Sequence, residues 1–137
     1  MAHAIEVRYL LDTNIFIYIR QGRDDVVRRL VKVHPGEVAV SIISYGELFF
    51  GAFKCGRVED LEQLRFLMGR LPCLTLPEDA AERYGDIRAD LESRGEIISN
   101  NDLWIAAHAL ASGLTLVTNN EKEFRRVRGL KLQNWVA

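Results

Sequence analysis

The chain has 137 residues, of which 48% are hydrophobic and 27% are charged, and its net charge at neutral pH is -1. A chain of this size buries about two thirds of its unfolded surface, so we expect residues 1–137 to form a single domain. The composition excludes a disordered chain, and no stretch approaches the roughly 18 uncharged apolar residues of a membrane helix. Cys55 and Cys73 lack zinc-site spacing, so we expect reduced thiols and a cytoplasmic protein that does not bind membranes.

Short apolar runs alternate with helical patterns along the whole chain. The first half predicts strands at 7–11 and 38–41 and helices at 13–21, 24–33, 44–55 and 58–71. The second half predicts strands at 73–76, 115–117 and 130–132 and helices at 77–94, 100–112 and 121–127. Strands that alternate with helices favour a parallel sheet. The predicted fold class is therefore α/β, as a three-layer α/β/α sandwich with a short, mainly parallel central sheet.

The segment 100–120 is the most informative part of this pattern. Three residues of helix-capping type end at Asp102, an apolar run from Leu103 to Ala111 follows, and Gly113 ends the helix. A helix that is apolar on nearly every face is buried, which places the Asp102 carboxylate at the edge of a core. His108 lies about 240° round the helix from Asp102, and we interpret it as a structural histidine.

Polar residues follow two of the predicted strands. Asp12 comes directly after the first strand, and Asn119 and Asn120 follow the strand at 115–117 and Thr118. Ligands of parallel α/β sheets bind outside the carboxyl ends of the strands, so these side chains are candidates for a shared site. The alternative interpretation of Asp12 is a helix N-cap.

A third carboxylate comes from Glu47, which lies on a helical stripe with Gly51. The alternative is a solvated glutamate on a helix surface. Together with Asp12 and Asp102 it would form an oxygen-only site suited to Mg²⁺ or Mn²⁺, which can activate water for attack on phosphorus. Phosphate-binding loops, dinucleotide fingerprints, zinc-protease motifs and serine-hydrolase elbows are missing from the sequence.

Basic residues crowd the C-terminal end of the chain. Lys122, Arg125 and Arg126 lead this group, and Arg128 and Lys131 follow. Such a cluster is usually a solvated face, but near a phosphodiesterase site it predicts non-specific contacts with nucleic-acid phosphates.

Four motifs carry a family resemblance: LLDTNIFIY, SIISYGELFFGA, NNDLWIAAHAL and LTLVTNNEKEF. In this order and spacing they resemble the PIN-domain ribonucleases, specifically the VapC-type toxins of bacterial toxin-antitoxin pairs. The resemblance implies an α/β/α sandwich with an acidic Mg²⁺ or Mn²⁺ site, and an endonuclease that hydrolyses RNA phosphodiester bonds with metal-activated water. Matched by motif, Asp12, Glu47 and Asp102 take the family's three principal acidic positions.

The chain departs from the family at one position. Many PIN proteins carry a fourth acid in the turn after the strand at 115–117, and Asn120 stands there in this sequence. We therefore expect one well-bound ion, with a second only when substrate phosphate completes its coordination. The resemblance also implies that Thr13, Asn14 and Thr118 are supporting polar residues.

The resemblance further implies a homodimer and a cognate antitoxin, whose C-terminal segment wraps the toxin and inserts a basic side chain among the carboxylates. Tyr45, Phe49 and Phe53 are interpreted as core residues by their four-residue spacing. Under the resemblance they form part of an antitoxin groove instead, a hypothesis that fails if all three are buried within the monomer. Trp104 is interpreted as a core residue.

The main alternative is a non-catalytic partner-binding module of the same fold, in which the carboxylates hold a basic peptide. Asn120 and the near-neutral net charge motivate it. A phosphoacceptor receiver domain is disfavoured because Ser41 and Pro77, not aspartates, follow the second and third strands. A DNA flap nuclease would need a longer chain for its substrate clamp.

Overall fold

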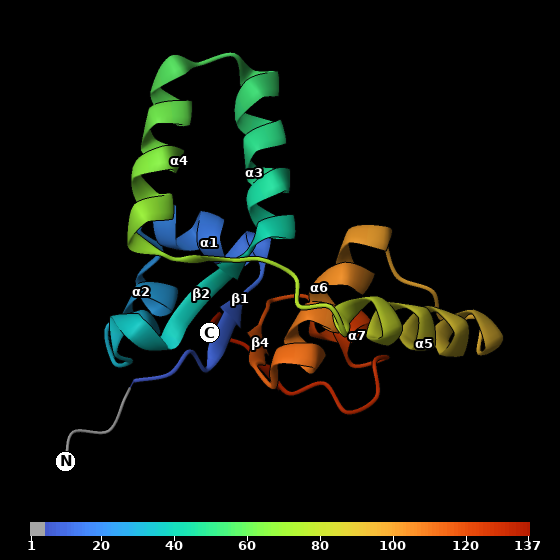
Figure 1. The fold of residues 1–137 in the computed structure, drawn as a ribbon. Coiled ribbons are helices and arrows are strands. Elements are labelled where there is room, and N and C mark those ends of the chain that lie inside the picture. The colour runs from blue at the N-terminus through green and yellow to red at the C-terminus, as the bar shows by residue number, and fades with distance from the viewer. Residues whose placement is uncertain (1–4) are drawn as a thin grey trace.

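The computed structural model describes residues 5–137, and a parallel sheet of five strands runs through its centre (Figure 1). The sheet has the order β3-β2-β1-β4-β5, and each neighbouring pair is parallel. Its strands are β1 (Tyr9–Leu11), β2 (Val38–Ser41), β3 (Cys73–Leu74), β4 (Thr115–Val117) and β5 (Leu132–Gln133). The predicted α/β class and parallel sheet are confirmed.

The helices fill the connections between the strands, as right-handed parallel crossovers require. They are α1 (Thr13–Arg20), α2 (Asp24–Leu30), α3 (Ile42–Cys55), α4 (Val58–Arg70), α5 (Ala80–Ser93), α6 (Asn100–Ser112) and α7 (Glu121–Phe124), with a 3-10 turn, η1, at Pro35–Glu37. Within residues 5–137 no helix is long and apolar enough to cross a bilayer.

Two hydrophobic clusters cover the two faces of the sheet, because side chains alternate along each strand. Tyr9 and Leu11 of β1 point into a cluster with side chains of α1 to α4, such as Phe16. Leu10, between them, points into the other cluster with side chains of α5, α6 and the segment around Phe124. This arrangement is the predicted three-layer sandwich.

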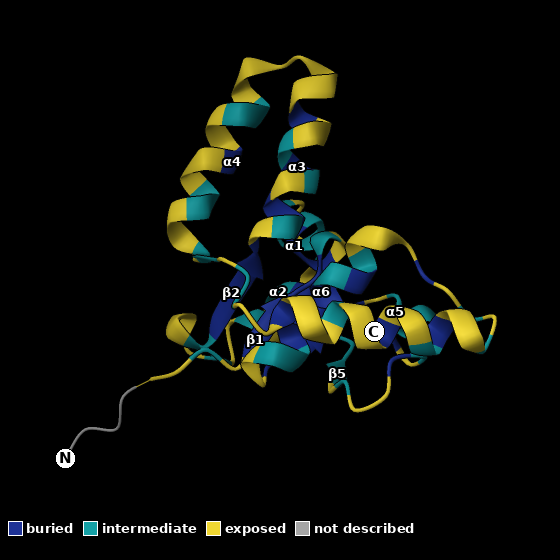
Figure 2. Ribbon diagram, turned by 45° about the vertical axis from the view of Figure 1, so that its right-hand side comes forward, coloured by how far each residue is buried: buried dark blue, intermediate teal, exposed yellow. Residues whose placement is uncertain are grey.

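The α3 and α4 helices form a hairpin that extends beyond the sheet (Figure 1) and is largely exposed (Figure 2). Of the predicted aromatic stripe, Tyr45 is buried at the base of the hairpin, Phe49 is half-buried and Phe53 is 63% exposed. The core interpretation is therefore right for Tyr45 and wrong for Phe53. Outward-facing Phe50 and Phe66 add to the apolar surface of the hairpin.

Several element boundaries differ from the predictions for local reasons. α3 begins at Ile42 and not at 44, because the Ser41 hydroxyl accepts a hydrogen bond from Ile43 N and caps the helix. The helix expected from Pro77 begins at Ala80, after a turn. The last strand is Leu132–Gln133 rather than 130–132, and the helix expected at 121–127 ends at Phe124. The strand expected at 73–76 contains only Cys73–Leu74.

Candidate active site

Within the sheet, β1 is flanked by β2 on one side and by β4 on the other. Asp12, directly after β1, therefore lies at the topological switch point of the sheet. Its side chain is 5% exposed, and both carboxylate oxygens accept hydrogen bonds. Oδ1 accepts from Thr13 N and Oδ2 accepts from the Thr118 hydroxyl, each at 2.8 Å. Asp12 thus caps α1, as the alternative interpretation held, and is at the same time fixed at the carboxyl end of the sheet.

Glu47 reaches the same end of the sheet from α3. The Thr13 hydroxyl donates to Glu47 Oε1 at 2.8 Å, so Thr13 contacts both carboxylates, Asp12 through its backbone N–H and Glu47 through its hydroxyl. Beside Glu47 lies an open groove of about 680 Å³, which is lined by Thr13, Ile42, Ile43, Gly46, Glu47, Phe50 and Asn101. A substrate can therefore approach Glu47 from solvent.

Asp102 lies in the first turn of α6. The N-cap is Ser99, whose hydroxyl accepts a hydrogen bond from Asp102 N at 3.3 Å. The cap therefore lies one residue before the predicted capping residues 100–102. With the cap supplied by Ser99, the Asp102 carboxyl faces Asp12 and lies within hydrogen-bonding reach of Glu123.

Burial and neighbouring negative charge dominate the electrostatics of the site. Burial, followed by the charge of Asp12 and the contact with Glu123, raises the pKa of Asp102 to about 7, although the Ser99 hydrogen bond acts in the opposite direction. Burial also raises the pKa of Asp12, against the lowering effect of its hydrogen bonds from Thr118 and Thr13.

Glu123 is the residue that sequence reasoning missed. It lies on α7, and its Oε2 accepts a hydrogen bond from Asn120 Nδ2 at 2.9 Å. Asn120 N in turn donates to the Thr118 hydroxyl at 2.9 Å, which links Glu123 to Asp12 through a chain of polar contacts. The expectation that only an amide occupies this corner is therefore corrected. The Asn-x-x-Glu spacing at a helix start is the signal that would have found Glu123.

The remaining predicted residues differ in their exposure and in their contacts. Asn14, Lys122 and Arg125 are exposed, and Arg125 pairs with Glu121 at 3.4 Å. Arg126 lies differently from the prediction of an RNA contact, because its guanidinium donates to main-chain carbonyls of the loop before α6.

His108 and Trp104 of α6 are both predicted by the sequence to have structural roles. His108 is fully buried and its Nδ1 lies 2.9 Å from the Ser41 hydroxyl, in agreement with a structural histidine. Trp104 is only half-buried, and it stacks on Tyr84 with 4.0 Å between the ring centroids. The core interpretation is therefore right only in part for Trp104.

The donor set is suited to a hard divalent cation. Asp12, Glu47, Asp102 and Glu123 supply carboxylate oxygens, and none of them forms an ion pair with a Lys or Arg side chain within residues 5–137. Over the same part of the chain, no three His, Cys, Asp or Glu side chains are arranged tightly enough to hold a metal ion as they stand.

Comparisons with known proteins agree with this geometry. The family model described as PIN domain matches residues 9–130. Ribonuclease VapC2 of Rickettsia felis is 40% identical over 130 residues, which cover 93% of this chain and 97% of the relative. The tRNA(fMet)-specific endonuclease VapC of Shigella flexneri is 35% identical over 130 residues, with 94% and 98% covered.

A solved structure extends the likeness to three dimensions. The crystal structure of VapBC2 from Rickettsia felis, bound to a DNA fragment from their promoter, matches with a TM-score of 0.87 and 38% identity. The match covers 95% of this chain and 100% of that chain. The chain therefore belongs to the PIN-domain family, and its curated relatives are VapC ribonucleases. The resemblance inferred from the four motifs is confirmed.

Proposed function

We propose that this chain is a Mg²⁺- or Mn²⁺-dependent endoribonuclease, the toxin of a toxin-antitoxin pair, and that residues 1–137 act as one nuclease domain. The observation that carries the proposal is the convergence of Asp12, Glu47, Asp102 and Glu123 at the carboxyl end of the sheet, where none of them has a Lys or Arg partner among residues 5–137. When bound there, a divalent ion supplies water activation and neutralises charge on the phosphate oxygens.

The chain's own residues prepare the site for that chemistry. Thr13 and Thr118 hold the Asp12 carboxylate in one orientation, and Asn120 does the same for Glu123. Asp102 must lose its proton to become a ligand, because burial and its acidic neighbours raise its pKa to about 7. The fourth charge on Glu123 removes the argument that Asn120 weakens a second metal site, and two ions then fit the donor set as well as one.

The proposed substrate is RNA, in line with the ribonuclease and tRNA(fMet)-specific endonuclease names of the relatives. Lys122 and Arg125 are the exposed basic residues that we propose contact the RNA backbone beside the site.

The proposed partners are a cognate antitoxin and a second copy of the chain, acting in the cytoplasm. The solved relatives are VapBC complexes, and the outward-facing Phe50, Phe53 and Phe66 of the α3–α4 hairpin supply apolar surface for such contacts. Phe49 and Phe53 are accessible enough to line the proposed antitoxin groove, whereas Tyr45 is buried and does not line it.

The decisive experiment is cleavage of cellular RNA, followed by sequencing of the RNA ends, with purified wild type, Asp12→Ala and Asp102→Asn. Each substitution removes a proposed ligand, so we expect cleavage to fall by about a thousandfold, and EDTA to abolish the wild-type activity. Asp24→Asn, at a 77% exposed position on α2, is the control that keeps full activity.

Equal cleavage by wild type and both site variants, or cleavage that persists in EDTA, would contradict the proposal. Antitoxin binding without Mn²⁺ binding would favour the non-catalytic module instead.

A further inference from the structure

Glu123 lies on a very short helix, and Asp102 lies at the start of α6, directly after a loop. The helix of Glu123, α7, has only four residues, and the loop before Asp102 joins α5 to α6. A helix this short is not stable by itself, so tertiary contacts must fix the position of Glu123. The contacts that join these two segments therefore control the spacing of Asp102 and Glu123.

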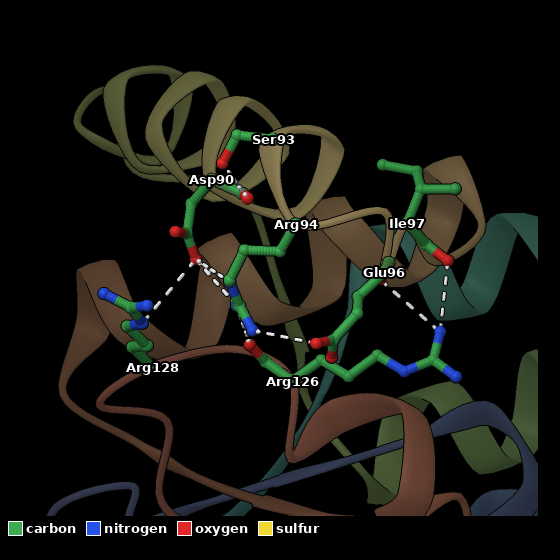
Figure 3. Close-up of polar contacts among 7 residues, drawn as sticks. All are labelled: Asp90, Ser93, Arg94, Glu96, Ile97, Arg126 and Arg128. Carbon is green, nitrogen blue, oxygen red and sulfur yellow. Dashed lines mark hydrogen bonds and ion pairs between the residues drawn. The ribbon is translucent and has the colours of Figure 1, made fainter.

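Arg126 makes the first of these contacts. Its Nη1 donates to the carbonyl oxygens of Glu96 at 3.4 Å and Ile97 at 3.2 Å, in the loop that leads to Asp102 (Figure 3). The main chain of Arg126 is tied to Glu123 as well, because Arg126 N donates to Glu123 O at 3.1 Å. One residue thus joins the turn that carries Glu123 to the loop before α6.

Arg94 makes the reciprocal contact from the end of α5. Its Nη2 donates to Arg126 O at 2.6 Å and to Asp90 Oδ2 at 2.7 Å, and its Nη1 lies 3.5 Å from Glu96 Oε1 (Figure 3). Each arginine therefore binds the main chain of the opposite segment. Arg128 adds only a long contact to Asp90, at 3.9 Å.

These polar contacts act on spacing and not on folding as a whole. Ile98, Phe124 and Val127 are all buried in the same hydrophobic cluster and anchor the two segments to the core. Two acidic side chains held side by side repel each other, which favours separation of the two segments. The paired arginines oppose this movement with charge-assisted hydrogen bonds, which are stronger than neutral ones.

We propose that Arg94 and Arg126 are positioning residues that hold the segments carrying Asp102 and Glu123 together, so that both carboxylates can reach a divalent cation. The inference rests on the proposed function, since it assumes that these carboxylates bind the ion. It also replaces the predicted role of Arg126 in RNA binding, because the guanidinium is already engaged by Glu96 and Ile97.

The test compares Arg126→Ala with Arg125→Ala in the full-length protein. Both remove one positive charge from the same segment, but the Arg125 side chain is 69% exposed, and its polar contact among residues 5–137 is with Glu121 on the surface. Mn²⁺ binding to the free protein is measured by electron paramagnetic resonance, and KM for RNA is measured at saturating Mn²⁺. Loss of an outer-sphere contact of this kind is expected to weaken Mn²⁺ binding about tenfold in Arg126→Ala. Arg125→Ala should bind Mn²⁺ as wild type does.

The change in KM for RNA separates positioning from substrate contact. If Arg126 only positions the site, its loss leaves KM for RNA at saturating Mn²⁺ close to the wild-type value, whereas loss of Arg125, a proposed RNA contact, raises it. Arg126→Lys keeps a cationic donor and should recover part of the Mn²⁺ affinity. Thermal unfolding establishes that the variants are folded, and Arg94→Ala, expected to weaken Mn²⁺ binding several-fold, replaces Arg126→Ala if that variant is unstable.

Wild-type Mn²⁺ affinity in both Arg126→Ala and Arg94→Ala would overturn the positioning role while leaving the proposed function intact. A higher KM for RNA in Arg126→Ala with unchanged Mn²⁺ affinity would also overturn it, in favour of substrate contact. Failure of the wild type itself to bind Mn²⁺ would overturn the proposed function and the positioning role together.

Discussion

Asp102 keeps its proton close to neutral pH in the free protein. Burial is the largest cause of the raised pKa, and the negative charge of Asp12 and the contact with Glu123 add to it. The same features suit the proposed role of Asp102 as a ligand, because a bound divalent cation would replace the proton and offset the repulsion. Metal binding should therefore weaken as the pH falls below about 7.

The pKa of Asp102 predicts how the stability of the metal-free protein depends on pH. The ordinary pKa is 3.8 and the folded-state pKa is about 7, so between these values the folded state holds a proton that the unfolded state has lost. Stability contributed by Asp102 is thus present below about pH 4 and is lost as the pH rises to about 7. Above that range, Asp102→Asn should be more stable than wild type by on the order of 2 kcal/mol.

Urea unfolding in EDTA at a series of pH values measures this difference. Asp24→Asn, on the exposed face of α2, should follow the wild-type curve throughout. If the curves of Asp102→Asn and wild type stay parallel from pH 4 to 8, the raised pKa is refuted.

At the scale of elements, capping connects the helices to the site. Ser41 caps α3 through Ile43 N and also contacts His108 Nδ1 at 2.9 Å, and it is fully buried between β2 and α6. Ser99 caps α6 in the same way but is exposed. The two serines therefore have the same local role in different surroundings.

Replacement of the two capping serines by alanine should have unequal effects. Ser41→Ala removes a cap and leaves buried His108 without its partner, so we expect a loss of about 2 to 3 kcal/mol in the free energy of unfolding. Ser99→Ala should cost about 1 kcal/mol or less, because water replaces the lost hydrogen bond. Urea unfolding at pH 8 measures both. Equal losses would mean that the contact between Ser41 and His108 contributes nothing.

At the scale of the whole molecule, the fold brings together carboxylates from the end of β1 and from α3, α6 and α7, which repel one another. The hydrophobic clusters on both faces of the sheet provide the stability that tolerates this repulsion. If the proposed cation binds these carboxylates, it stabilises the protein, because only the folded state brings the four together.

Mn²⁺ should therefore raise the unfolding temperature of the wild type. At a hundredfold excess over the dissociation constant, ligand binding adds about 2.7 kcal/mol, which corresponds to about 8 °C for a domain of this size. Asp12→Asn should show no such increase, because Asp12 lies closest to the centre of the sheet and faces the other acids. Differential scanning calorimetry measures the unfolding temperature of both proteins. A similar increase with Mn²⁺ in wild type and in Asp12→Asn would place the ion elsewhere.

The sequence by itself determined the order of the elements and, through local pattern and family resemblance, indicated three of the four carboxylates that the fold brings together. Alternation of apolar strands with helical patterns specifies a parallel sheet, and that sheet places a residue such as Asp12 at the end where ligands bind. Glu47 and Asp102 could be found because each stands at a marked position on a helix, one on a stripe with glycine and the other in a first turn. Local pattern is sufficient for such residues.

Only the tertiary structure decided what depends on contacts between distant segments. The place of Glu123 beside Asp102 follows from the packing of α7 against the start of α6, 21 residues apart in the chain. The contacts of Arg126 with Glu96 and Ile97 have the same origin, since a basic residue in a charged cluster carries no local sign of its partner. Helix periodicity and capping act over a few residues, whereas the separation of two charges is set by how whole segments pack.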